Sequence, residues 1–411
     1  MPGFSRGWPA ALAAAAALAV GALLPLPAQA PPAPSIAARA ETTHWRQAQE
    51  TVLRQRSQAV LQRDEAAFMA SVDPAASGEF RRRQRELFGD LAELPLASWD
   101  YQVEQLPGGD PARPRVELSY ALAGVDAVPT RRPMNFTFTA RGGRWFISAD
   151  ARPPHEPWDF GRSRVLRTEH GVIVGHDGAD GLAERLTGEL DGAVASVTDV
   201  WGPDWSRQVG VLLPRSREEL RALVGAEFAV DGIAAVAVAD KVDVSSGRVE
   251  GPRVVLNTET ASRLSDTSLR VVLRHEIAHV AARADTAEGA PMWLLEGFAD
   301  YIGYRDSGLP PERIAPDLRA QARTGALPAA PPGEADFHQA GRRLDLAYQQ
   351  SWSLIEHLVR RVGEPKVVEL YRRIARAGTP DAVDPALREL AGISTDELLR
   401  GWHEELTNRF R

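Results

Sequence analysis

Residues His275 to His279 read His-Glu-Ile-Ala-His, an HExxH pattern within an apolar stretch that favours a helix. Two imidazoles four residues apart lie about 40° from each other around a helix, so both reach one metal ion. Glu276 projects beside that face, where it accepts a proton from water without being a ligand. A solvated helix face is the alternative, but the apolar flanks indicate burial, and burying these groups without a purpose is costly. The layout is typical of a zinc hydrolase.

A catalytic zinc ion normally takes three protein ligands and keeps a fourth position for water, so a third ligand must exist. Glu296 follows His279 by 17 residues, in a segment (290–303) that reads as a second amphipathic helix. Asp300 follows on the same helical face, where a carboxylate can hold the outer N–H of one ligand His, although an acidic residue near a helix end can also be plain solvated surface. We therefore predict one Zn²⁺ ion bound by His275, His279 and Glu296, with Asp300 supporting a ligand.

The pattern HEIAH followed by WLLEGFADY resembles the gluzincin zinc metallopeptidases, and within them the peptidase MA-like domains of bacterial extracytoplasmic proteins. The resemblance covers about residues 160–411, and its specificity is concentrated in residues 271–304. It implies the same zinc ligands and a role for Glu276 as general base and then general acid in the hydrolysis of peptide bonds. The expected substrate is therefore a peptide or protein.

The resemblance also implies that a Tyr or His on a later helix donates a hydrogen bond to the developing oxyanion. Tyr348 is the candidate, with His338 and His357 in reserve. Tyr348 also falls at helical spacing with the apolar residues Trp352 and Ile355, which fits an ordinary core stripe. Both interpretations of Tyr348 stay open at this point.

Peptide substrates of such enzymes usually bind as an added strand at the edge of a small sheet. Residues 232–238 and 252–257 read as strands, and we favour 254–257 as the strand that leads into the zinc helix, although the sequence does not decide which strand is outermost. Residues 164–177 and 207–216 supply two more strands, with a helix at 182–202 between them. His170 and His176 fall in this region and are interpreted as non-ligands.

The composition excludes several classes of protein. The chain has 411 residues and no cysteine, which excludes structural disulfides, a thiolate zinc site and a lipid-modified cysteine. The net charge is −7, and no Lys/Arg stripe pairs with aromatic residues, which argues against a nucleic-acid partner.

Residues 1–30 have the outline of a signal peptide, an apolar run that ends in Ala28-Gln29-Ala30. Pro31 disfavours cleavage there, so retention as an N-terminal membrane tether stays open, and the predicted location is extracytoplasmic in either case.

The remaining length predicts two domains, because it exceeds what one typical core can hold. The predicted fold class is α+β throughout. The expected order is a Pro/Ala tether at 31–40, an accessory domain at 41–150, a linker at 151–160 and the zinc metallopeptidase domain, with a small sheet and paired zinc-site helices, at 161–411. Helices followed by strands make the accessory domain resemble the cone-shaped fold of the nuclear-transport-factor and ketosteroid-isomerase group. The helices are expected at 44–64, 65–72 and 78–91, and the strands at 99–106, 114–122, 133–143 and 144–150.

The sequence therefore predicts an exported zinc-dependent peptidase. One alternative is a non-catalytic zinc-site binding protein of the cell envelope, against which the intact Glu276 speaks. An intramembrane metalloprotease is excluded, because Arg274 and Arg283 flank the motif and no long apolar run surrounds it. Residues 306–337, which are rich in proline, are expected to form a lid-like insertion before the helix of Tyr348.

Overall fold

The computed structural model describes residues 36–104, 110–225 and 233–410, so the predicted signal peptide or anchor lies outside the described residues. The described chain forms two compact units of mixed α and β structure. One comprises residues up to 123 together with 129–163, and the other comprises 124–128 and the chain from 164 onward. None of the described helices combines the length and the apolar character needed to span a bilayer.

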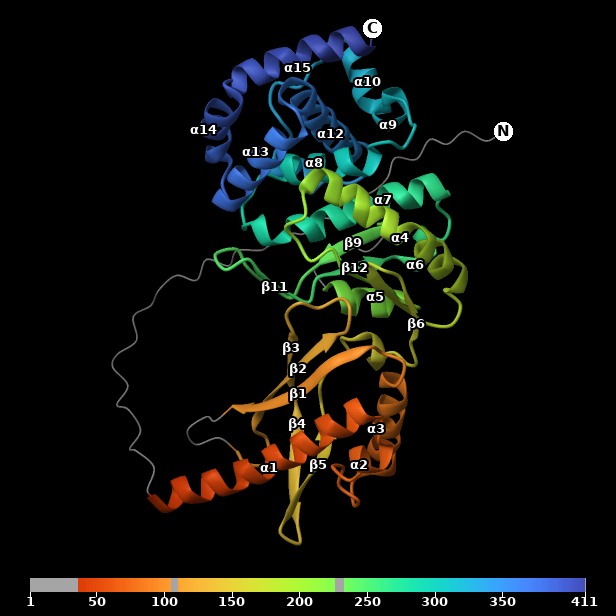
Figure 1. Ribbon diagram of the computed structural model, residues 1–411, viewed down its shortest axis with the longest axis vertical. Helices are drawn as coiled ribbons and strands as arrows, with labels where there is room; N and C mark the ends of the chain where they lie inside the picture. The colour runs from red at the N-terminus through yellow and green to blue at the C-terminus, as the bar shows by residue number, and fades with distance from the viewer. Residues whose placement is uncertain (1–35, 105–109, 226–232, 411) are drawn as a thin grey trace. The chain divides into compact units, whose positions relative to one another are not determined.

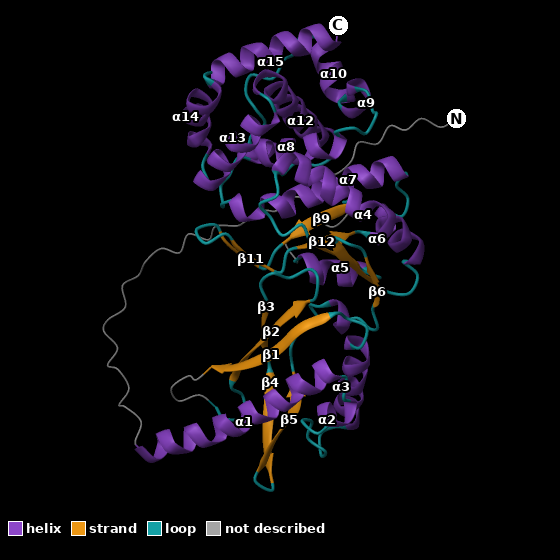
Figure 2. Cartoon of the chain, in the orientation of Figure 1, coloured by secondary structure: helices purple, strands orange, loops and turns teal. Residues whose placement is uncertain are grey.

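The first unit begins with three helices, although the first starts inside the predicted tether: α1 (Ile36–Gln62), α2 (Glu65–Met69) and α3 (Gly78–Leu91). Five strands follow: β1 (Leu96–Glu104), β2 (Arg115–Leu122), β3 (Thr130–Met134), β4 (Phe136–Arg141) and β5 (Arg144–Asp150). Strands β1, β2 and β3 form one antiparallel sheet, and β4 and β5 form a separate hairpin (Figure 2). The prediction of a single strand at 133–143 is therefore wrong, because β3 ends at Met134 in one sheet and β4 begins at Phe136 in another. The likeness of this unit to the cone-shaped fold stays a prediction.

The segment predicted as a linker is partly packed into this first unit. It contains a short 3-10 turn, η1 (Pro157–Asp159), whose Trp158 is buried against the rings of Trp99 and Tyr120. Glu156 is also buried and accepts a hydrogen bond of 2.8 Å from the hydroxyl of Tyr120.

The second unit is built on a five-stranded sheet with the order β6-β7-β8-β12-β9. Its strands are β6 (Arg164–Arg167), β7 (Gly171–Gly175), β8 (Val209–Leu213), β12 (Arg253–Leu256) and β9 (Ala235–Val238). Strands β7, β8 and β12 run parallel, and the two outer strands, β6 and β9, run antiparallel to their neighbours. The strand favoured as the route into the zinc helix, β12, is thus an interior strand, and β9 is the edge. The connection between β9 and β12 forms a hairpin of β10 (Lys241–Asp243) and β11 (Arg248–Glu250).

Helices α4 (Asp180–Trp201) and α7 (Asp266–Ala282) pack together on one face of this sheet (Figure 1). Arg270 of α7 makes two hydrogen bonds of 2.7 Å to the carboxylate of Glu189 on α4. Apolar residues of both helices and alternate sheet residues such as Val211 and Val254 form the common core. Two short helices complete the region around the sheet: α5 (Arg217–Val224) and α6 (Thr258–Ala261).

The rest of the unit is helical. The helices are α8 (Met292–Tyr304), α9 (Pro311–Ile314), α10 (Pro316–Arg323), α11 (Glu334–Phe337), α12 (Arg342–Val362), α13 (Glu364–Ala377), α14 (Val383–Ala386) and α15 (Thr395–Phe410). Short turns of other helix types are η2 (Arg283–Asp285), η3 (Pro380–Ala382) and η4 (Leu387–Ala391). Helix α8 packs against both α7 and α12, and this three-helix arrangement carries the candidate site.

The segment expected to be a lid is anchored to the helical core. Ala315, Leu318 and Phe337 are fully buried in the same apolar cluster as α8 and α12. The side-chain oxygen of Gln349 on α12 accepts hydrogen bonds from the backbone N–H groups of Asp317 and Leu318, at 2.8 and 3.0 Å. These contacts give the segment three short helices that pack as part of the domain.

Candidate metal centre

Helix α7 places the HExxH residues beside the core. Ser265 precedes the helix and accepts a hydrogen bond from the N–H of Ser268, which satisfies one free donor of the first turn. Leu273 and Ile277 are fully buried beside the motif, so the helix is fixed by its apolar face. The two histidines therefore have a defined direction toward α8.

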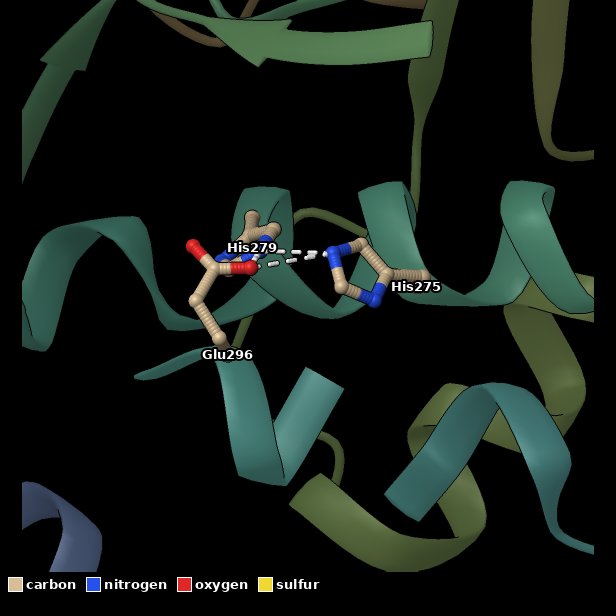
Figure 3. Close-up of side chains that lie close together, drawn as sticks. All are labelled: His275, His279 and Glu296. Atoms are coloured by element: carbon tan, nitrogen blue, oxygen red, sulfur yellow. Dashed lines mark hydrogen bonds and ion pairs between the residues drawn. The ribbon is translucent and has the colours of Figure 1, made fainter. Parts of the chain in front are cut away.

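The structure brings His275, His279 and Glu296 together, as Figure 3 shows. The Nε2 atoms of the two imidazoles lie 3.2 Å apart, and Oε2 of Glu296 lies 3.3 Å from Nε2 of His275 and 3.5 Å from Nε2 of His279. All three side chains are largely shielded from solvent, Glu296 most of all, with a side-chain exposure of 7%. Three ligand atoms from two helices thus converge on one point.

This triangle fits a zinc ion. Atoms bound tetrahedrally to zinc at about 2.0–2.1 Å lie about 3.3–3.4 Å apart, which is the spacing observed here. Hydrogen bonds alone do not satisfy the polar atoms of this cluster. One imidazole N–H can point at only one acceptor. In the described part of the chain, Oε2 of Glu296 is buried and makes no hydrogen bond. Two neutral nitrogen donors and one carboxylate are also the donor types that zinc prefers.

The electrostatic setting of Glu296 agrees with a cation site. Burial by itself raises the pKa of this carboxyl, but the two imidazoles outweigh the burial and hold the pKa of Glu296 well below its usual range. The side chain is therefore a carboxylate at neutral pH, which is the form that binds a metal ion.

Asp300 lies one helical turn beyond Glu296, and its Oδ1 is 2.9 Å from Nδ1 of His275. Both side chains are nearly buried, at 12% exposure for His275 and 14% for Asp300. A proton on Nδ1 that is donated to the carboxylate leaves the lone pair of Nε2 directed at the triangle. Asp300 is predicted from the sequence to support a ligand His, and the structure brings the side chains of Asp300 and His275 together.

Glu276 is buried on the same helix, next to the edge strand β9. Helix α7, which carries Glu276, packs against β9. Burial raises the pKa of Glu276, an effect that the neighbouring His275 and His279 oppose. A carboxylate with a raised pKa is a better proton acceptor than an exposed one, which suits a general base.

Tyr348 enters the site from α12. Its ring centre lies 6.5 Å from that of His275, and its hydroxyl is buried without a hydrogen bond to any described residue. Burial and the nearby carboxylates, Glu296 foremost, raise the pKa of Tyr348, so the hydroxyl keeps its proton. Phe337 packs edge-on against the Tyr348 ring with 5.4 Å between the ring centres, and this contact fixes the ring in place.

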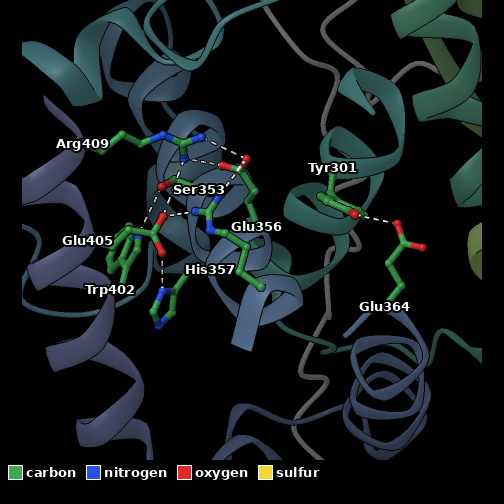
Figure 4. A network of polar contacts seen from close by, with 9 residues as sticks. Tyr301, Ser353, Glu356, His357, Glu364, Trp402, Glu405 and Arg409 are labelled. Atoms are coloured by element: carbon green, nitrogen blue, oxygen red, sulfur yellow. Dashed lines mark hydrogen bonds and ion pairs between the residues drawn. The ribbon is translucent and has the colours of Figure 1, made fainter. Parts of the chain in front are cut away.

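The other histidines lie elsewhere. His357 is held by Glu405, with 2.7 Å between Nδ1 and Oε2, in a polar network that joins α12 to α15 (Figure 4). His338 is exposed near Glu334, and His176 pairs with the buried Glu219 at 2.8 Å. The reserve donors His338 and His357 are therefore not part of the cluster that holds His275.

Three further features escaped the sequence analysis. They are the packing of β9 against the helix that carries Glu276, the ring of Phe337 against Tyr348, and two glycines of α8, Gly297 and Gly303, that lie against α12 and α7. The approach of a strand backbone leaves no signal in residue type. Phe337 ends a proline-rich stretch whose burial only the tertiary structure reveals.

Comparison with known proteins gives only distant similarity. No family model matches the chain, and no curated protein matches it. Among solved structures, the chain is similar to an M1 zinc metallopeptidase from Deinococcus radiodurans, with 19% identity, a TM-score of 0.34 and coverage of 66% of this chain and 59% of that one. It is also similar to yeast LTA4 hydrolase, with 10% identity, a TM-score of 0.37 and coverage of 75% and 60%. The chain thus spans about three fifths of the length of these enzymes, and similarity at this level assigns neither an activity nor a substrate.

Proposed function

We propose that this chain is an exported zinc-dependent peptidase. The single observation that carries the proposal is the triangle of His275, His279 and Glu296, with sides of 3.2 to 3.5 Å, beside the buried carboxylate of Glu276. A site that only stored a metal ion would need these three ligands, but it would not need the additional carboxylate of Glu276, which is not one of them.

Zinc, when bound to these three ligands, acidifies a water molecule and polarises a substrate carbonyl. Glu276 accepts the proton as the water oxygen forms its bond to the carbonyl carbon. When the C–N bond breaks, the same side chain delivers that proton to the departing amine nitrogen.

Tyr348 and Asp300 complete the chemistry. The hydroxyl of Tyr348 donates a hydrogen bond to the carbonyl oxygen as negative charge develops on it. This role is consistent with a buried hydroxyl that has no other partner among the described residues. Asp300 keeps the proton of His275 on Nδ1, which leaves Nε2 free to bind the metal.

The substrate binds as an extended peptide along β9. Among the described strands, β9 pairs only with β12, so its other edge is open. Strand β9 packs against α7, the helix that carries Glu276, so a peptide paired with β9 passes the general base.

The test uses a quenched-fluorescent peptide library and the purified protein loaded with one equivalent of zinc. We expect cleavage that is abolished by a chelator, restored by zinc and lost in Glu276→Gln, with zinc affinity within about threefold of the wild type, since Glu276 is not a ligand. Glu288→Gln is the matched control, because it makes the same chemical change at an exposed position between α7 and α8, and it should keep full activity. A wild type that binds zinc and cleaves no peptide would instead be a zinc-binding protein.

The extracytoplasmic location is a separate part of the proposal. It depends on the apolar segment at residues 1–30, which lies outside the described residues. Cell fractionation followed by N-terminal sequencing of the mature protein tests it. A full-length protein that stays in the cytoplasmic fraction would contradict export and leave the proposed chemistry untouched.

A further inference from the structure

Helix α8 approaches α12 so closely at Gly297 that no side chain fits. A Cβ atom at this position would lie 2.5 Å from the carbonyl oxygen of Ser351 and 2.7 Å from its carbonyl carbon. Both contacts are with backbone atoms, which cannot rotate aside. The spacing of α8 and α12 next to Glu296 therefore depends on glycine.

A second close approach occurs at Gly303, on a different face of α8. A Cβ atom there would lie 2.9 Å from the carbonyl oxygen of Val271 on α7, and 3.6 Å from Cβ of His275. Gly303 thus lies against the helix that carries the two histidines, one turn before the motif. The same helix, α8, is held against one neighbour by Gly297 and against the other by Gly303.

We propose that Gly297 and Gly303 are positioning residues that set two separate helix spacings. Gly303 sets the spacing of α7 and α8, and with it the distance from Glu296 and Asp300 to the imidazoles. Gly297 sets the spacing of α8 and α12, and with it the distance from Tyr348 to the metal ligands. The role of Gly297, which concerns catalysis and is called the catalytic half, rests on the proposed function. The role of Gly303, which concerns metal binding and is called the metal half, does not.

The displacements follow from the contacts. Ordinary van der Waals contact of a Cβ atom begins at 3.4 Å, so alanine at position 297 requires a shift of about 0.9 Å and alanine at 303 a shift of about 0.5 Å. Zinc sites tolerate ligand distances within about 0.2 Å of their preferred values, and the shift at 303 exceeds that range between the two helices that carry the ligands. At 297 the clash is with α12, which carries none of the three ligands, so we expect α12 and its Tyr348 to move while α8 stays in place against α7. A misplacement of about 1 Å in a catalytic site can cost about 100-fold in rate.

The test compares Gly297→Ala and Gly303→Ala with Gly188→Ala in the full chain. Gly188 is an exposed helical glycine of α4 with no atom within 4 Å of an added Cβ, so it controls for the substitution itself. Zinc dissociation constants are measured by competition with a chromophoric chelator, and kcat and KM are measured on one peptide at saturating zinc.

We expect Gly303→Ala to weaken zinc binding by at least about tenfold. Gly297→Ala should keep the zinc affinity within about threefold and lower kcat by about 100-fold, with KM little changed. Gly188→Ala should match the wild type in every measurement. If the two glycines only stabilised the fold, their replacement would not affect zinc affinity in one variant and kcat in the other.

The inference is overturned if both variants match Gly188→Ala, or if both lose zinc affinity and kcat in equal measure. It is also overturned if neither variant folds in saturating zinc, because the glycines would then be needed for folding alone. If the wild type binds zinc but cleaves nothing, the proposed function fails, and the zinc affinity of Gly303→Ala still decides the metal half.

Discussion

Asp300 offers the most direct test of how the candidate site is organised. Its carboxylate lies 2.9 Å from Nδ1 of His275, and the pair is nearly buried. Asn at this position keeps the shape and a neutral hydrogen bond to Nδ1, whereas Ala removes the bond altogether. The two substitutions therefore separate the charge of Asp300 from its hydrogen bond.

The expected magnitude follows from the role of the contact. Removing the outer partner of a ligand histidine typically costs about 10- to 100-fold in metal affinity, which corresponds to about 1.4–2.7 kcal/mol. A charge-assisted hydrogen bond is roughly twice as strong as a neutral one, so Asn should retain about half of the effect. We therefore expect zinc to bind about tenfold more weakly to Asp300→Asn and about 100-fold more weakly to Asp300→Ala.

The measurement is a zinc titration in competition with a chromophoric chelator at pH 7.4. Thermal unfolding adds a second readout, because a 100-fold weaker affinity removes about 2.7 kcal/mol of stabilisation by excess zinc, or about 5–10 °C in the melting temperature of a unit of this size. Glu219→Gln is the control, since it alters a similar buried carboxylate–imidazole pair, with His176, outside the cluster. Wild-type zinc affinity in both Asp300 variants would refute the reasoning.

Three further outcomes are expected. Tyr348→Phe keeps the buried ring and should leave zinc affinity and melting temperature nearly unchanged while kcat falls about 100- to 1000-fold, and an unchanged kcat would remove Tyr348 from the chemistry. Gln349→Ala leaves two backbone N–H groups of α10 without their acceptor, so limited proteolysis should cut within residues 306–337 faster than in the wild type, and equal rates would count against this anchor. The hydrogen bond from Arg141 holds the pKa of Asp73 below its usual value, so the stability that it contributes is present above about pH 4 and is lost as the pH falls through the lowered pKa. Asp73→Asn should therefore flatten the fall in melting temperature below pH 4, whereas a fall as steep as that of the wild type would contradict the assignment.

The candidate site is predictable from sequence because its geometry is mostly local. The positions of His275 and His279 follow from helical periodicity alone, and Asp300 follows from Glu296 by the same rule. Glu296 lies close to His279 because one short connection joins the two helices that carry them. Tyr348 needed the resemblance, since its spacing fits a core stripe equally well.

The parts that escaped prediction depend on contacts between distant segments. The two apolar stretches that became β9 and β12 look alike in sequence, and only the pairing of β12 with β8 makes one of them interior. The proline-rich segment after α8 reads as a loop, because the burial of Leu318 and Phe337 arises from packing against α12. The start of α1 within the Pro/Ala stretch likewise shows that a local composition rule can be overridden.

The donor atoms of the candidate site all come from 22 consecutive residues, 275–296, whereas Tyr348 arrives from a helix that begins at Arg342. Short chain closures form at lower entropic cost than long ones, so a growing or refolding polypeptide can capture its ion before α12 docks. Under the proposed function, metal uptake would then precede the arrival of Tyr348 in the maturation of each molecule. An immature chain that already holds its ion would still lack this hydrogen-bond donor, and its kcat would be as low as that of Tyr348→Phe.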